Sequence, residues 1–140
     1  MVKKRHNNTK AFTLSELLLV VAIMAFVFSS IIITLMACFL LNEMNRNLSI
    51  AATHAQYVAE DIKDTASTLM GFSGLSAQIT DGDWNWNATE INTAGLAALD
   101  NETIATSVSG TSLLDINVTV NWKDRRRSRN MSLETLVAEP

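Results

Sequence analysis

The residue with the clearest chemical role is Glu16, a carboxylate at the start of a long apolar segment. From Leu17 to Leu41 the chain has 25 residues and no charged side chain. A segment of about 20 apolar residues is long enough to cross a bilayer as a helix. An ionisable side chain in such a place costs free energy unless it finds a partner, so it usually marks a functional site. Glu16 is therefore a candidate functional residue that requires a partner.

A second group of candidates is a basic cluster near the C-terminus, Arg125, Arg126, Arg127 and Arg129. Such a cluster suits phosphate contacts or ion pairs with an acidic neighbouring protein, although exposed charge runs are most often solvated loops. No aromatic residue lies within it to stack on bases. Outside residues 1–11, seven bases face 14 acids. Nucleic acid is thus a disfavoured partner, and a role in DNA uptake stays an alternative.

Oxygen-bearing side chains alternate between residues 81 and 90, as they do in a calcium-binding loop: Asp81, Asp83, Asn85, Asn87 and Glu90. An EF-hand also needs a glycine at its sixth position and a glutamate at its twelfth, where this chain has Trp86 and Asn92. A polar turn with side-chain caps is the simpler interpretation. We therefore expect no cofactor and keep Asp81, Asp83 and Asn85 as weak calcium candidates.

The sequence contains no recognisable combination of catalytic residues. The chain has two histidines, His6 and His54, and one cysteine, Cys38, which lies inside the apolar segment. Because His54 has no second histidine or cysteine near it, neither a zinc site nor a catalytic triad is indicated. A single cysteine also excludes an intramolecular disulfide. We expect a structural protein and not an enzyme.

The elements that position these groups begin with one long helix. No glycine or proline occurs from residue 12 to residue 70, and the first stop signals are the glycines of residues 71–74. Beyond the uncharged segment, apolar residues recur every three or four positions, which is typical of an amphipathic helix. We predict a helix over residues 13–70, with a transmembrane half in residues 12–41 and an amphipathic half in residues 42–70.

Residues 71–140 are expected to form a small head with a β-hairpin at its end. Apolar and polar residues alternate from Leu114 to Trp122, which predicts a strand with one buried face. A loop from Lys123 to Asn130 and a second strand complete a hairpin over about residues 113–137. Its apolar face, including Trp122, should pack on the helix face formed by Val58, Ile62, Ala66 and Leu69.

The remaining part of the head has little periodicity. In residues 75–112 only the stretch 91–100 suggests a short helix or strand. The predicted fold class is therefore α+β, with one long N-terminal helix packed on a small antiparallel sheet.

The N-terminal sequence resembles the prepilin signal of type IV pilins and type II secretion pseudopilins. The shared features are a basic leader, a small residue and the run from Phe12 to Leu17 with Glu16 in it. The resemblance implies that a prepilin peptidase removes residues 1–11 by cutting between Ala11 and Phe12, and that the new Phe12 amine is N-methylated. It further implies that Glu16 meets the Phe12 amine of a neighbouring subunit in a filament.

The same resemblance implies the location and the partners. The basic leader would stay in the cytoplasm, the helix would lie in the lipid of the inner membrane, and the head would be periplasmic until the subunit enters a filament. The partners would be other pilin or pseudopilin subunits, the peptidase and an inner-membrane assembly platform.

The C-terminal strands add a second, looser resemblance, which concerns the kind of subunit. Val118, Val120 and Trp122, followed by a basic stretch and a last strand, resemble the end of minor pilins and of I-type minor pseudopilins. Two positions depart from the common pattern: Ala11 stands where glycine is usual, and Ile33 where many pilins have proline. A minor subunit is the favoured interpretation. An uncleaved, single-pass, membrane-anchored periplasmic binding domain is the alternative.

Overall fold

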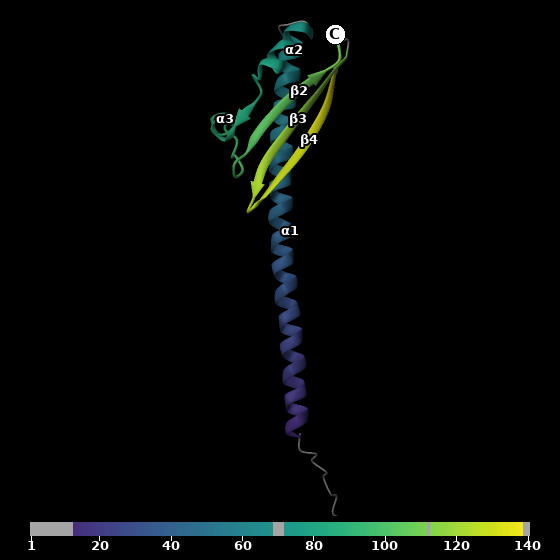
Figure 1. The fold of residues 1–140 in the computed structure, drawn as a ribbon, viewed down its shortest axis with the longest axis vertical. Coiled ribbons are helices and arrows are strands. Elements are labelled where there is room, and N and C mark those ends of the chain that lie inside the picture. Colours follow the sequence, from purple (N-terminus) through teal and green to yellow (C-terminus); the bar gives the residue numbers. More distant parts are fainter. Residues whose placement is uncertain (1–12, 69–71, 112, 139–140) are drawn as a thin grey trace, which may run out of the picture. The chain divides into compact units, whose positions relative to one another are not determined.

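The computed structural model describes residues 13–68, 72–111 and 113–138. Its first element is the helix α1 (Leu14–Thr68), a single run of 55 residues (Figure 1). The helix predicted over residues 13–70 is confirmed as far as the described residues reach. The chain divides into two compact units, and the boundary falls within α1, between Leu41 and Asn42.

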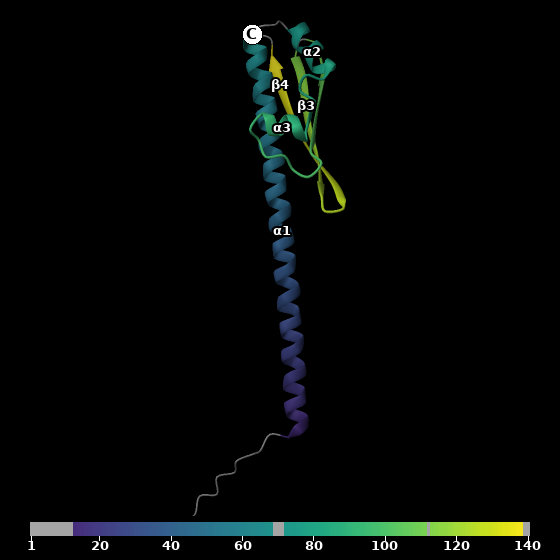
Figure 2. The ribbon, with the colours of Figure 1, turned by 90° about the vertical axis from the view of Figure 1, so that its left-hand side faces the viewer.

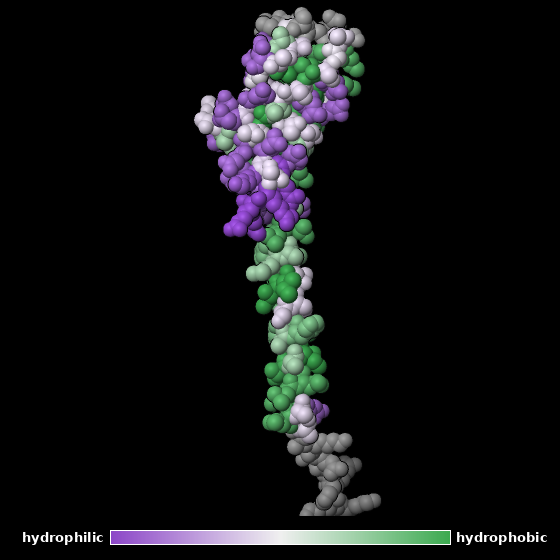
Figure 3. Space-filling model, in the orientation of Figure 1, coloured by the Kyte–Doolittle hydropathy of each residue, from purple (hydrophilic) through white to green (hydrophobic). Residues whose placement is uncertain are grey.

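The first unit contains the apolar part of α1. From Leu14 to Leu41 every side chain is exposed, including Phe26 at 77% and Phe39 at 74%, and Figure 3 shows this stretch mostly in the colours of apolar residues. By length and composition α1 is a helix that could cross a membrane. A helix that is apolar on all sides needs lipid or other protein segments around it.

Three hydroxyl side chains in the middle of this stretch bond back to the helix itself. Ser29 donates to the carbonyl of Ala25 at 2.8 Å, Ser30 to that of Val27 at 2.8 Å, and Thr34 to that of Ser30 at 2.9 Å. Polar groups in an apolar surrounding must be satisfied internally. These residues are therefore compatible with an apolar environment on every side of the helix.

The second unit combines the rest of α1 with a small sheet. Its other elements are α2 (Phe72–Asp81), β1 (Trp86–Asn87), α3 (Ala88–Thr93), β2 (Thr103–Ser109), β3 (Leu113–Asp124) and β4 (Arg127–Ala138). The strands form one antiparallel sheet in the order β1-β2-β3-β4. The sheet lies beside the C-terminal half of α1 (Figure 2). The predicted α+β fold, a long helix packed on an antiparallel sheet, is confirmed.

The core of this unit lies between α1 and the inner face of the sheet. The helix contributes a stripe of residues spaced by three or four: Ala51, Ala55, Val58, Ala59 and Ile62. The central strand β3 contributes every second residue: Leu114, Ile116, Val118, Val120 and Trp122. Three of the helix residues are alanines, and their small side chains let the sheet approach the helix closely. Burial of these apolar side chains supplies the main stabilisation of the unit, about 25 cal/mol per Å² removed from water.

The predicted packing face is confirmed for the residues that the structure describes. Val58 and Ile62 are fully buried, Ala66 is half-buried against the core, and Trp122 is 5% exposed. Leu69, the fourth predicted residue, lies outside the described residues.

The hairpin has longer strands and a shorter turn than the sequence predicted. The expected loop from Lys123 to Asn130 is wrong, because β4 begins at Arg127 and only Arg125 and Arg126 form the turn. Arg125 has a φ of 58°, a backbone region in which tight hairpins usually place glycine, asparagine or aspartate. The sequence did not predict this two-residue turn because both of its residues are arginines, and neither is of a type that usually forms such a turn.

The segment between α1 and β2, where periodicity is weak, contains two short helices. The α3 helix begins with a capping box: the Asn87 side chain accepts from the backbone N–H groups of Thr89 and Glu90, and the Glu90 carboxylate accepts from that of Asn87. Its buried residue is Ile91. The element suggested over residues 91–100 is therefore the end of this helix followed by a loop.

A buried polar pair connects α1 with the loop before β2. His54 Nδ1 lies 2.7 Å from Glu102 Oε1, and the other Glu102 oxygen accepts from the backbone N–H of Leu99 at 2.6 Å. The two residues are 3% and 1% exposed. The contact is a hydrogen bond when the ring is neutral and an ion pair when it is protonated. Because the pair is desolvated, each member depends on the other to satisfy it.

Loss of one member of this pair should destabilise the head. His54→Ala leaves a Glu102 oxygen buried without its partner, so we expect the free energy of unfolding to fall by about 3 kcal/mol. The measurement is urea denaturation of the detergent-solubilised chain, followed by tryptophan fluorescence. Thr53→Ala, at the adjacent exposed position, is the control and should change the value by less than about 0.5 kcal/mol. Equal effects of the two substitutions would contradict a structural role for the pair.

Two carboxyl groups lie near each other on the outer face of the sheet. Asp115 in β3 and Glu134 in β4 are diagonal neighbours, since Glu134 pairs with Asn117 in the register. A hydrogen bond with Asp115 and the negative charge of Asp115 raise the pKa of Glu134 above its ordinary value of 4.5. The Asp115 Oδ1 atom is buried and has no hydrogen-bond partner among the described residues.

This contact predicts a pH dependence. Below pH 4.5 Glu134 is protonated in both the folded and the unfolded chain, and its contact with Asp115 is a hydrogen bond. As the pH rises through the raised pKa, the contact becomes a repulsion between carboxylates, so its contribution to stability is lost over that window. NMR titration of the Glu134 carboxyl carbon should show the raised pKa, and Asp115→Asn should lower it towards the ordinary value. An unchanged titration in Asp115→Asn would refute the coupling.

Candidate functional site

The first candidate, Glu16, lies in the first turn of α1. The Thr13 carbonyl accepts from the backbone N–H groups of Glu16 at 3.0 Å and Leu17 at 3.2 Å, so Thr13 occupies the cap position of the helix. The Thr13 and Ser15 hydroxyls bond to each other at 3.1 Å. The first N–H groups of a helix point outwards and carry the positive end of its dipole, which favours a carboxylate here by about 0.3–1 kcal/mol.

The Glu16 carboxylate has no neighbour of opposite charge within the described residues. It is exposed, and it enters neither of the two salt bridges found in the part of the chain that the structure describes. The residues that follow it along α1 up to Leu41 are uncharged and mostly apolar. Among the described residues, the site is therefore an exposed carboxylate beside a large apolar surface.

The two residues of the predicted processing site, Ala11 and Phe12, lie outside the described residues. Thr13 is the first described residue and is not helical, and α1 begins at Leu14. A cut between Ala11 and Phe12 would therefore leave a chain whose helix begins at its third residue. In that chain the new amine and the Glu16 carboxylate would lie four residues apart.

The second candidate is the β3–β4 turn with its flanking residues. We call Lys123, Arg125, Arg126, Arg127 and Arg129 the basic turn. All of these side chains are exposed except that of Arg129, which is half-buried. Four of the five side chains therefore remain in contact with solvent and can bind anionic groups.

Two members of the basic turn contact α1. Arg125 Nη2 lies 2.9 Å from Glu43 Oε2, in a pair whose side chains are 62% and 50% exposed. Arg129 Nη2 lies 3.8 Å from the Met44 sulfur. A surface pair of this kind contributes about 0–1 kcal/mol. Its effect is chiefly to hold the turn beside the start of the second unit.

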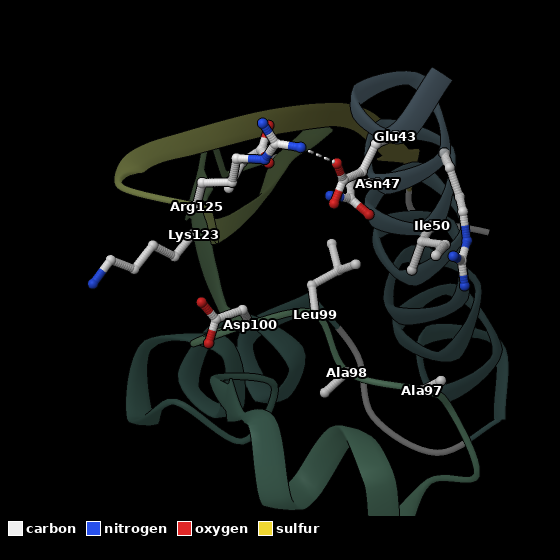
Figure 4. Close-up of a pocket in the computed structure, with 11 residues that line it drawn as sticks. Glu43, Asn47, Ile50, Ala97, Ala98, Leu99, Asp100, Lys123 and Arg125 are labelled. Carbon is white, nitrogen blue, oxygen red and sulfur yellow. Dashed lines mark hydrogen bonds and ion pairs between the residues drawn. The ribbon is translucent and has the colours of Figure 1, made fainter. Parts of the chain in front are cut away.

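An open pocket lies next to this pair. It has a volume of about 330 Å³ and is lined by residues of α1, the loop before β2 and the basic turn. In Figure 4 Leu99 points into the space between the loop and α1, Arg125 reaches across to Glu43, and Lys123 extends away from the helix. The lining carries both signs of charge around a small apolar floor. Such a site suits a charged group with a short apolar part.

The calcium candidates are distributed around the capped turn before α3. Asp81 and Asp83 are exposed, whereas Asn85 Oδ1 accepts from the backbone N–H of Thr106 at 2.8 Å. Of the other two oxygen-bearing residues, Asn87 and Glu90, both belong to the capping box. In the described part of the chain, no three His, Cys, Asp or Glu side chains come together as a metal site. The structure therefore does not bring the candidates into one ligand set.

Sequence reasoning missed two features that shape these sites. Glu102 received no role, although it is the buried partner of His54; the available signal was His54 itself, a polar residue on the apolar face between Ala51 and Val58. Glu43 also received no role, and its contact with Arg125 joins positions 82 residues apart. No local sequence pattern predicts a contact over that separation.

The chain was also compared with known proteins. No family model, no curated protein and no solved structure matches it.

Proposed function

We propose that the chain is a minor subunit of a type IV pilin-like or type II secretion pseudopilin filament. It is stored in the inner membrane through α1, processed at its N-terminus and then assembled through the apolar part of that helix. Its function is structural, and it catalyses no reaction. The proposal rests on the resemblance of the N-terminal run to the prepilin signal, together with the geometry of α1.

The observation that carries the proposal is the exposed apolar stretch with a single carboxylate at its beginning. Residues 14–41 offer apolar surface on all sides, which lipid can cover before assembly and neighbouring helices can cover afterwards. Glu16 is the one ionisable residue in α1 before Glu43 except for Cys38. In a bundle of such helices, an unpartnered carboxylate requires a positive group at the same depth.

A new N-terminal amine meets this requirement. Staggering two copies of the helix brings the Phe12 amine of one copy to the level of Glu16 of the next, so that two charges neutralise each other within an apolar bundle. Loss of one member of a buried ion pair typically costs about 3–5 kcal/mol, because the other member stays desolvated. The pair therefore favours one stagger of neighbouring helices, since only that stagger brings both charged groups together.

The alternative function is that of an uncleaved, membrane-anchored periplasmic domain that binds a partner through its head. The open pocket at the basic turn favours it. The two functions differ in the N-terminus of the purified protein, which is Phe12 with an added methyl group only if the chain is processed.

Processing should depend on the small side chain at position 11. Ala11→Leu should leave the full-length precursor in the membrane, because a bulky residue blocks the peptidase at the cut. Ala11→Gly is the matched control and should mature normally. Intact-mass spectrometry of chains purified from cells that contain the peptidase distinguishes precursor from product. Normal maturation of Ala11→Leu would exclude the assigned site, and full-length wild-type protein would favour the uncleaved anchor.

Glu16 should act between subunits. Glu16→Ala removes the carboxylate that the neighbouring amine needs, so we expect membrane insertion and cleavage to continue while incorporation into filaments falls at least tenfold, the effect of about 1.4 kcal/mol. The measurement is co-purification with filament partners, beside a mass determination of the N-terminus. Glu60→Ala removes an exposed acid elsewhere on α1 and should assemble normally. Assembly of Glu16→Ala at the parental level would refute the charge pair.

A further inference from the structure

The basic turn is held beside the first residues of the second unit. Arg125 pairs with Glu43, and Arg129 lies against the sulfur of Met44. These contacts place the tip of the β3–β4 hairpin at the same level of α1 as residues 43 and 44. The opposite end of the hairpin, where Leu113 pairs with Ala138, is separated from this tip by the whole length of both strands.

Glu43 follows closely on the apolar stretch. It comes two residues after Leu41 in a continuous helix, which corresponds to a rise of about 3 Å. If α1 crosses a bilayer, as the proposed function requires, Glu43 lies at the membrane–water interface. The basic turn, which contacts Glu43, then lies at the depth of the lipid headgroups.

The charge at this place suits lipid phosphates. The basic turn and Arg46, a neighbouring residue of α1 in the pocket lining, supply six bases, whereas Glu43, Asp100 and Asp124 are the carboxylates of that lining. Guanidinium groups bind phosphate through two parallel hydrogen bonds. Of the seven bases after the leader, only Lys63 lies elsewhere. The positive charge of the second unit is thus concentrated at its membrane-proximal end.

We propose that the basic turn, together with Arg46, binds the phosphate groups of anionic lipids at the membrane surface. Basic segments next to a membrane helix are attracted to anionic headgroups, and this attraction weakens with salt. The binding would hold the head against the membrane while the subunit is stored there. Entry into a filament would require the release of this contact.

A lipid surface fits the geometry better than a nucleic acid does. Because Glu43 comes only two residues after the apolar stretch, the headgroups would lie within reach of the basic turn in every membrane-bound copy. A duplex would have to approach the same turn along a surface in which acids outnumber bases, and no aromatic residue follows the arginines to stack on bases. DNA binding is therefore an outcome that the test must be able to detect.

The test uses the full chain in lipid nanodiscs. One variant carries Cys38→Ser and Ser128→Cys, with an environment-sensitive fluorophore at position 128 in the basic turn. Nanodiscs contain either phosphatidylcholine alone or the same lipid with 30% phosphatidylglycerol, and each type carries headgroup-linked quencher lipids. We expect quenching at position 128 to be at least twofold stronger in the anionic discs, and to fall to the neutral value in 0.5 M salt.

Three controls make the outcome specific. Arg126→Gln with Arg127→Gln removes two exposed bases while keeping the Arg125–Glu43 pair, and should abolish the difference between the lipids. Lys63→Gln should leave it unchanged. A label at Ser109→Cys, at the other end of the sheet, should show no dependence on lipid charge.

The result can also contradict the proposal. Equal quenching at position 128 in both lipids, or an unchanged difference in the double arginine variant, would overturn it. A response to a DNA duplex in neutral discs without a response to anionic lipid would assign the turn to nucleic acid instead. If the chain fails to enter neutral discs, α1 is not a membrane anchor, and both this inference and the proposed function are refuted. Insertion without lipid dependence would refute this inference alone.

Discussion

His54 and Glu102 form a fully buried polar contact inside an interface that is mostly apolar, and the position of the head on the helix depends on it. Apolar attraction has no preferred direction, whereas a hydrogen bond requires its donor and acceptor to meet at a defined distance and angle. A buried carboxylate has no such freedom, since a displacement of one helical turn would leave it unpaired. Glu102 also holds the backbone of Leu99. The pair therefore fixes both the register of the sheet on α1 and the loop that lines the pocket.

The same interface explains why α1 continues beyond the apolar stretch. After α1 ends, about 70 residues of the chain remain, too few to bury an extensive core among themselves. The helix supplies one wall of that core and β3 supplies the other. Stability of the head is therefore coupled to the integrity of the helix over residues 51–62, although the chemistry proposed for the chain lies at Glu16, far earlier in the sequence. Asp61 reinforces the coupling by accepting a hydrogen bond from the Trp84 indole at 2.7 Å.

Local patterns predicted the long helix and the C-terminal hairpin because each has a strong period. The alternation in β3 and the spacing of Val58 and Ile62 reflect burial on one face, which is a local property of the chain. The short helices α2 and α3 were not predicted, because six to ten residues carry too few turns for a period to emerge. The partner of His54 and the contact of Arg125 with Glu43 were also beyond prediction, since they join residues that only the folded sheet brings together. At Glu16 the sequence indicated the need for a partner, and the geometry adds that none lies among the described residues.

The strand β4 lies at an edge of the sheet, where another copy of the chain could pair with it. An edge strand of 12 residues offers a row of backbone groups to any extended segment that comes close, which is the usual starting point of aggregation. Two arginines at its beginning and Glu134 further along interrupt its apolar residues with charge. Two such edges brought together in parallel would place like charges opposite each other, and this repulsion disfavours a sheet that grows from copy to copy. The charges on β4 therefore act against parallel growth of the sheet through this edge, in addition to the roles that the basic turn and the core residues have in a single chain.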